Sequence, residues 1–144
     1  MKAIELKGLD QTLYYEKLEN GLEVYMLPYK NKSNYTMHYL TKYGSIQTTF
    51  IPYGEKEKIT VPDGIAHFLE HKMFDMEDGD ASEKFAALGA SSNAFTSHSR
   101  TAYLFNTAAN VDECTELLLD FVQELNVTPE SIEKEKGIIN QEIG

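Results

Sequence analysis

The spacing of apolar residues along this chain changes at Gly64. Before Gly64, short runs of alternating apolar and polar residues are typical of strands, whereas after it longer stretches carry apolar residues every three to four positions, as helices do. Two more strand-like runs follow near the middle of the chain. Strands and helices therefore occupy separate blocks rather than alternating regularly, and this order predicts an α+β fold.

The strand-like runs are expected at residues 13–18, 22–27, 34–41, 91–97 and 101–106. Asn20 and Gly21 lie between the first two runs, and this pair favours a hairpin with a two-residue primed turn. The segment 45–63 contains Pro52, Gly54 and several charged residues, and we expect it to be a loop.

The helical pattern begins after Gly64, and we expect Asp63 to be the N-cap of the first helix. A short helix over 82–88 is predicted to end at Gly89, and an apolar stripe over 111–125 predicts a third helix. Thr128 and Pro129 match the N-cap and first position of a last helix. That helix reaches Gly144 without a stop signal, so we expect a single, truncated domain over residues 1–144.

Composition and charge exclude several classes of protein. Thirteen Lys and Arg stand against 23 Asp and Glu, and the net charge of −10 would repel a phosphate backbone. The longest apolar stretch is interrupted at Asp120, so no membrane span is expected. The first residues lack the apolar core of a secretory signal, which favours a cytoplasmic protein. The single cysteine, Cys114, excludes an internal disulfide and is expected in the core.

One cluster of residues is suited to chemistry, the sequence HFLEH at residues 67–71. On a helix, His67 and His71 lie one turn apart and roughly 40° around the axis, so both imidazoles project from one face. That arrangement can bind one Zn²⁺, and Glu70 can reach a metal-bound water from the same face. This is the inverted form of the commoner zinc helix. The alternative is an ordinary packing helix that happens to carry two histidines.

A two-histidine zinc site needs a third protein ligand. The last helix offers Glu135 and Glu142, which are two turns apart and share a face. Alternating charges along that helix are equally typical of a solvent-exposed surface. The spacing leaves the choice open among these two glutamates and the following residues: His38, His98, Asp75, Glu77, Asp78 and Asp80.

Four segments together resemble the pitrilysin/insulinase family of zinc metallopeptidases, which includes the mitochondrial processing peptidases. They are HFLEHKMF at 67–74, NAFT at 93–96, YLF at 103–105 and EKGIINQEI at 135–143. The details are closest to small bacterial, cytoplasmic members. The resemblance implies an antiparallel β-sheet with helices packed on one face, and a chain that covers only the first part of the zinc-bearing domain.

The resemblance also implies a role for each matching residue. His67, His71 and Glu142 would bind Zn²⁺, and Glu70 would be the general base. Glu135 would be a second carboxylate that supports the site. The segment 93–96 would be the edge strand that receives the substrate, through these residues: Asn93, Ala94, Phe95 and Thr96. An unpaired strand edge suits this role, because it offers main-chain hydrogen bonds to an extended peptide.

In the family, a homologous second domain or subunit supplies an Arg and a Tyr to the site, and neither can be placed in this chain. The resemblance therefore implies a zinc endopeptidase whose isolated fragment has weak activity or none. The alternative is a non-catalytic subunit that binds peptides without cutting them. Such a subunit would be expected to have lost at least one of the four site residues, yet all are present: His67, Glu70, His71 and Glu142.

Overall fold

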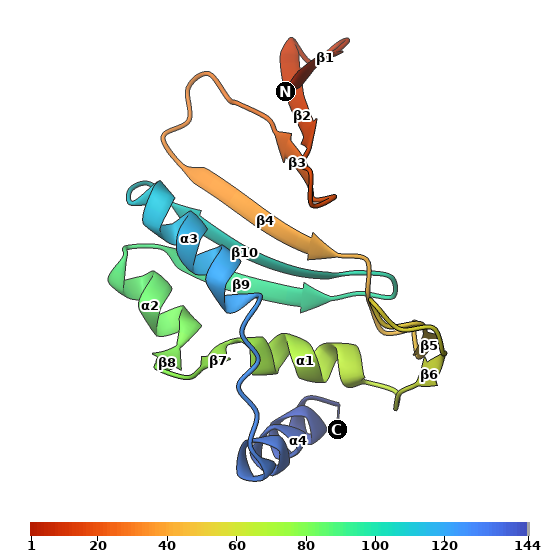
Figure 1. Cartoon of the computed structure of the whole chain (residues 1–144). Helices are drawn as coiled ribbons and strands as arrows, with labels where there is room; N and C mark the ends of the chain where they lie inside the picture. The colour runs from red at the N-terminus through yellow and green to blue at the C-terminus, as the bar shows by residue number, and fades with distance from the viewer. Residues whose placement is uncertain (144) are drawn as a thin grey trace. The chain divides into compact units, whose positions relative to one another are not determined.

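The computed structural model describes residues 1–143, and for Asn140, Glu142 and Ile143 it describes the backbone only. The chain divides into two compact units, residues 1–33 and the remainder from Asn34 onward (Figure 1). The expectation of a single domain stays a prediction. No helix in the described part of the chain is long and apolar enough to cross a membrane.

The first unit is a three-stranded antiparallel sheet in the order β1-β2-β3. It consists of β1 (Lys2–Leu6), β2 (Gln11–Lys17) and β3 (Glu23–Met26). The predicted β2–β3 hairpin is present, but the prediction that its turn has two residues is wrong. The N–H of Gly21 donates to the Leu18 carbonyl at 2.9 Å, and the N–H of Leu18 donates to the Leu22 carbonyl at 2.8 Å. Only Gly21 of the loop has a positive φ, which fits a three-residue loop with a bulge rather than a primed turn.

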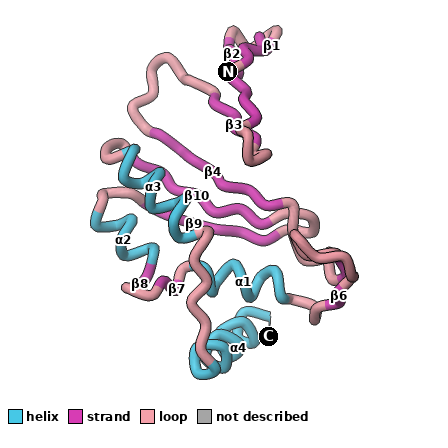
Figure 2. The backbone as a smooth tube through the Cα atoms, in the orientation of Figure 1, coloured by secondary structure: helices cyan, strands magenta, loops and turns pink. Residues whose placement is uncertain are grey.

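The second unit is built on a second antiparallel sheet in the order β4-β10-β9 (Figure 2). Its strands are β4 (Tyr35–Thr41), β9 (Ser91–Thr96) and β10 (Thr101–Thr107). β10 pairs with both neighbours, so within the described residues β9 is paired on one side only. The segment predicted as a loop carries a small hairpin of β5 (Thr49–Phe50) and β6 (Ile59–Thr60).

Four helices belong to this unit: α1 (Ile65–Met73), α2 (Ala81–Ala87), α3 (Val111–Phe121) and α4 (Pro129–Ile143). Between α1 and α2 lies the short hairpin of β7 (Asp75–Met76) and β8 (Gly79–Asp80). α1, α2 and α3 contact the same sheet (Figure 1). The predicted α+β fold, an antiparallel sheet with helices on one face, is confirmed.

The helix ends agree with two of the predictions, at Gly89 and Thr128, and differ from the others. Gly64, with φ of 84°, precedes α1 as its N-cap, so the expected cap at Asp63 is wrong. Gly89 ends α2 as predicted: it has φ of 77° and donates its N–H to the Ala86 carbonyl. Thr128 caps α4 as predicted, accepting the N–H of Ser131 at 3.1 Å. The third helix ends at Phe121, so its predicted extension to residue 125 is wrong.

The core lies between this sheet and the helices. Phe85 of α2 stacks on Phe105 of β10 with ring centroids 5.7 Å apart, and Phe121 of α3 meets Tyr103 of β10 edge-on at 5.5 Å. Cys114 is fully buried in the same cluster, as predicted. Ala94 of β9 packs against the cluster as well. The aromatic core therefore fixes β9 and β10 against the helices, and α1 contacts both of these strands.

Candidate metal centre and active site

The first helix, α1, brings together the three residues of the HFLEH motif that the sequence predicts to act. His67 and His71 are both half-buried, and their ring centroids lie 4.6 Å apart with an interplanar angle of 82°. The imidazoles are thus neighbours on one helix face, as the i, i+4 spacing predicts.

Glu70 lies on the same helix and is only 8% exposed. A buried carboxylate needs a polar partner, because removal from water disfavours its charged form. The hydroxyl of Thr96, on β9, supplies one and donates to Glu70 Oε2 at 2.5 Å. Tyr103 of β10 is also buried, and this burial, followed by the nearby Glu70 carboxylate, raises the pKa of its phenol. The phenol therefore stays protonated at neutral pH.

Glu135 of α4 is the residue that connects the last helix to the motif. Its Oε1 lies 2.8 Å from Nδ1 of His71, although the two residues are 64 positions apart. An ionised carboxylate only accepts hydrogen bonds, so Nδ1 carries the proton of this contact, and in a neutral imidazole Nε2 then carries the lone pair. This is the arrangement by which a carboxylate fixes the tautomer of a metal-binding histidine.

The described side chains supply two of the three protein ligands that a zinc site of this kind needs. Two neutral imidazoles, one of them oriented by a carboxylate, are suitable zinc ligands. Among the described side chains no group of three or more His, Cys, Asp or Glu is placed to hold a metal. The predicted third ligand, Glu142, lies in α4, and its side chain is outside the described residues. The assignment of Glu142 therefore stays a prediction.

The other candidates for the third ligand are exposed, and three of them have partners of their own. His38 in β4 and His98 in the β9–β10 turn are exposed. Asp75 pairs with Lys72, and Asp78 pairs with Lys84. Asp80 caps α2 by accepting the N–H of Ser82 at 2.7 Å, while the N–H of Glu77 donates to Glu124 at 2.6 Å.

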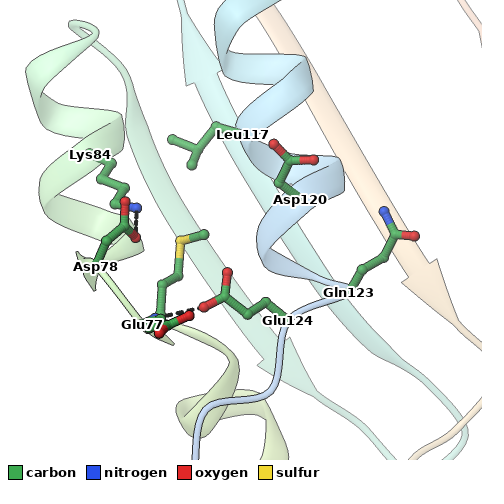
Figure 3. A pocket seen from close by; sticks show the side chains of 8 residues that line it. Glu77, Asp78, Lys84, Leu117, Asp120, Gln123 and Glu124 are labelled. Atoms are coloured by element: carbon green, nitrogen blue, oxygen red, sulfur yellow. Dashed lines mark hydrogen bonds and ion pairs between the residues drawn. The ribbon is translucent and has the colours of Figure 1, made fainter.

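Two of these acidic residues, Glu77 and Asp78, line an open groove between the β7–β8 hairpin, α2 and α3 (Figure 3). Within it, Lys84 points toward Asp78, and Glu124 points toward Glu77. The groove contains neither His67 nor His71. Glu77 and Asp78 therefore lie in an exposed groove that the two imidazoles do not line.

The predicted substrate strand, β9, shows two different faces. Ala94 and Thr96 are half-buried toward the helices, whereas Asn93 and Phe95 are exposed on the other face. All four residues pair with β10 along one edge of the strand. Their role in binding peptides stays a prediction, but the side chain of Thr96 is directed at Glu70 rather than outward.

Two residues close to the motif have contacts that were not predicted from the sequence. Thr96 contacts Glu70, and no local pattern could have shown this pairing, because the residues are 26 positions apart. Lys72 is 1% exposed and forms an ion pair with Asp75. The i, i+3 spacing of this second pair was a usable signal.

The sequence is similar to those of known proteins. The family model described as Insulinase (Peptidase family M16) matches residues 50–144. The uncharacterized zinc protease YmfH of Bacillus subtilis is 54% identical over 143 residues, which are 99% of this chain and 33% of that protein. The mitochondrial-processing peptidase subunit beta of Neurospora crassa is 30% identical over 131 residues, 87% of this chain and 25% of that protein.

A solved structure shows the same fold. A putative M16-like peptidase from Alicyclobacillus acidocaldarius superposes with a TM-score of 0.86 at 41% identity, over 97% of this chain and 32% of that one. The chain therefore spans about a third of the length of the first relatives it matches. The match over residues 50–144 and the identity to YmfH show that the chain belongs to the insulinase family, peptidase family M16.

Proposed function

We propose that the full-length protein carrying this chain is a zinc-dependent endopeptidase. The observation that carries the proposal is the 2.8 Å contact between Glu135 and Nδ1 of His71, since it orients one of two adjacent imidazoles for metal binding. The zinc-protease names of relatives support the same cofactor. His67, His71 and Glu142 would hold Zn²⁺.

When bound, Zn²⁺ would polarise the peptide carbonyl and lower the pKa of a water molecule. Glu70 would take the proton of that water at a carboxylate oxygen and pass it to the leaving amine nitrogen. Glu70 lies on the same helix as the two imidazoles and is only 8% exposed. Glu135 would hold His71 in one tautomer throughout.

The substrates would be extended peptides that add to the open edge of β9, using the main chain of 93–96. A homologous second domain or subunit would contribute an Arg and a Tyr. The name of the Neurospora relative, a subunit of a processing peptidase, supports such a partner. The 144-residue chain alone would then have little activity. A cytoplasmic location remains part of the proposal.

Replacing Glu70 by Gln tests this function in the full-length protein. Zinc content should stay the same, because Glu70 is assigned no bond to the metal. Hydrolysis of a fluorogenic peptide should fall by about 10²-fold or more, because the amide cannot accept the proton. Glu116→Gln, an exposed position on α3, is the matched control and should keep normal turnover. Normal turnover in Glu70→Gln would refute Glu70 as the general base, whereas a wild-type protein that binds peptides without cutting them would favour the non-catalytic alternative.

A further inference from the structure

The hydroxyl of Thr96 links the open-edged strand to the buried carboxylate of α1. Thr96 is the last residue of β9, and its side chain lies on the face of the sheet that meets the helices. Its Oγ1 is 2.5 Å from Oε2 of Glu70, at the lower end of the usual range for a hydrogen bond between a hydroxyl and a carboxylate. A strand fixed by pairing with β10 is thus in direct contact with the proposed general base.

The direction of this hydrogen bond follows from the neighbouring groups. Thr101, opposite Thr96 on β10, donates its own hydroxyl proton to the Tyr43 carbonyl at 2.9 Å. The distance between the Thr96 and Thr101 hydroxyl oxygens is 3.4 Å, too long to compete with the 2.5 Å contact. Since an ionised carboxylate can only accept, the proton of Thr96 points at Glu70.

We infer that Thr96 is a positioning residue that holds Oε2 of Glu70, so that Oε1 is the oxygen that exchanges the proton. This inference rests on the proposed role of Glu70 as general base. It gives the side chain of Thr96 a function separate from that of its main chain, which lies on the strand proposed to receive the peptide. Thr96 itself does not touch the reacting atoms.

Loss of the hydroxyl would change the placement of the carboxylate rather than the binding of the peptide. Glu70 is 8% exposed, so water cannot easily replace the missing donor, and the side chain would turn toward another partner. A small misplacement of a catalytic group is enough to slow a reaction strongly. Main-chain pairing along β9 would be unaffected, because valine fits a strand well.

The test compares Thr96→Val, Thr96→Ser and Thr101→Val in the full-length protein. Thr96→Val should lower kcat by about 10-fold or more, with KM within about twofold of wild type and zinc content unchanged. Thr96→Ser should restore most of kcat, because serine keeps the donor. Thr101→Val also loses a buried hydroxyl hydrogen bond, but its kcat should stay within about twofold of wild type.

A crystal structure of Thr96→Val provides a readout that does not depend on activity, and should show the Glu70 carboxylate rotated from its wild-type position. An unmoved carboxylate with normal kcat would overturn the inference, as would a raised KM with unchanged kcat. If the wild-type protein hydrolyses no peptide, the proposed function fails, and the position of Glu70 in the crystals still decides whether Thr96 holds it.

Discussion

Replacing Glu135 by Ala should weaken zinc binding without disrupting the fold. The wild-type contact joins the Glu135 carboxylate to Nδ1 of His71 at 2.8 Å, and the two side chains are only 15% and 22% exposed. A charge-assisted hydrogen bond at this depth fixes the ring and keeps Nε2 basic. Loss of such a partner typically weakens metal affinity 10- to 100-fold, or about 1.4 to 2.7 kcal/mol. Alanine is a good helix former, so α4 itself should persist.

The assay is zinc competition against a chromogenic chelator in the full-length protein, at a pH where histidine is neutral. Glu133→Ala is the matched control: it lies on the same helix and pairs with Lys136 in an exposed ion pair, with 73% of its side chain accessible. Its zinc affinity should stay within about twofold of wild type. Glu135→Gln should fall between the two variants, because a neutral amide oxygen accepts more weakly. Equal zinc affinity for Glu135→Ala and wild type would refute the assigned role of this carboxylate.

Three further predictions concern stability. A methyl group at Gly44 would lie 2.3 Å from the Ser97 carbonyl oxygen, so Gly44→Ala should lower the free energy of unfolding by about 1–3 kcal/mol in a urea titration. Gly137 lies on α4 with open space around it, so Gly137→Ala should raise the free energy of unfolding by about 1 kcal/mol in the same titration. Burial raises the pKa of the Tyr103 phenol above 10.0, so the folded state holds this proton more tightly than the unfolded state does. The free energy of unfolding should therefore fall as the pH rises beyond 10, and it should fall less steeply in Tyr103→Phe. Zinc should increase hydrogen-exchange protection in α4 but not in α3, and equal protection with and without zinc would contradict Glu142 as a ligand.

Local signals in the sequence predicted the helical elements that carry the motif. The positions of His67 and His71 follow from the 3.6-residue period of one helix, and this geometry requires no information from the rest of the chain. Gly89 and Thr128 also act through their immediate neighbours, and both were placed as predicted. The expected cap at Asp63 failed because Gly64 takes a left-handed conformation at that point and becomes the cap itself.

The contacts that complete the site depend on tertiary structure, and spacing alone could not supply them. Glu135 was one of several open candidates until the structure placed it against Nδ1 of His71. The resemblance to a family pointed to the same residue, but it gave no atom-level partner. The hydrogen bond from Thr96 to Glu70 could not be predicted from the sequence, because it depends on how β9 packs against α1.

These tertiary contacts make α1 the connection between the open-edged strand and the last helix. Through Glu70 it binds Thr96 of β9, and through His71 it binds Glu135 of α4. α4 contacts α1, and no described residue of α4 belongs to the buried aromatic core. A metal held by both helices would add to that contact. The residues proposed for catalysis therefore also position α4, and zinc affinity and protection of α4 should change together in any variant that breaks the His71–Glu135 pair.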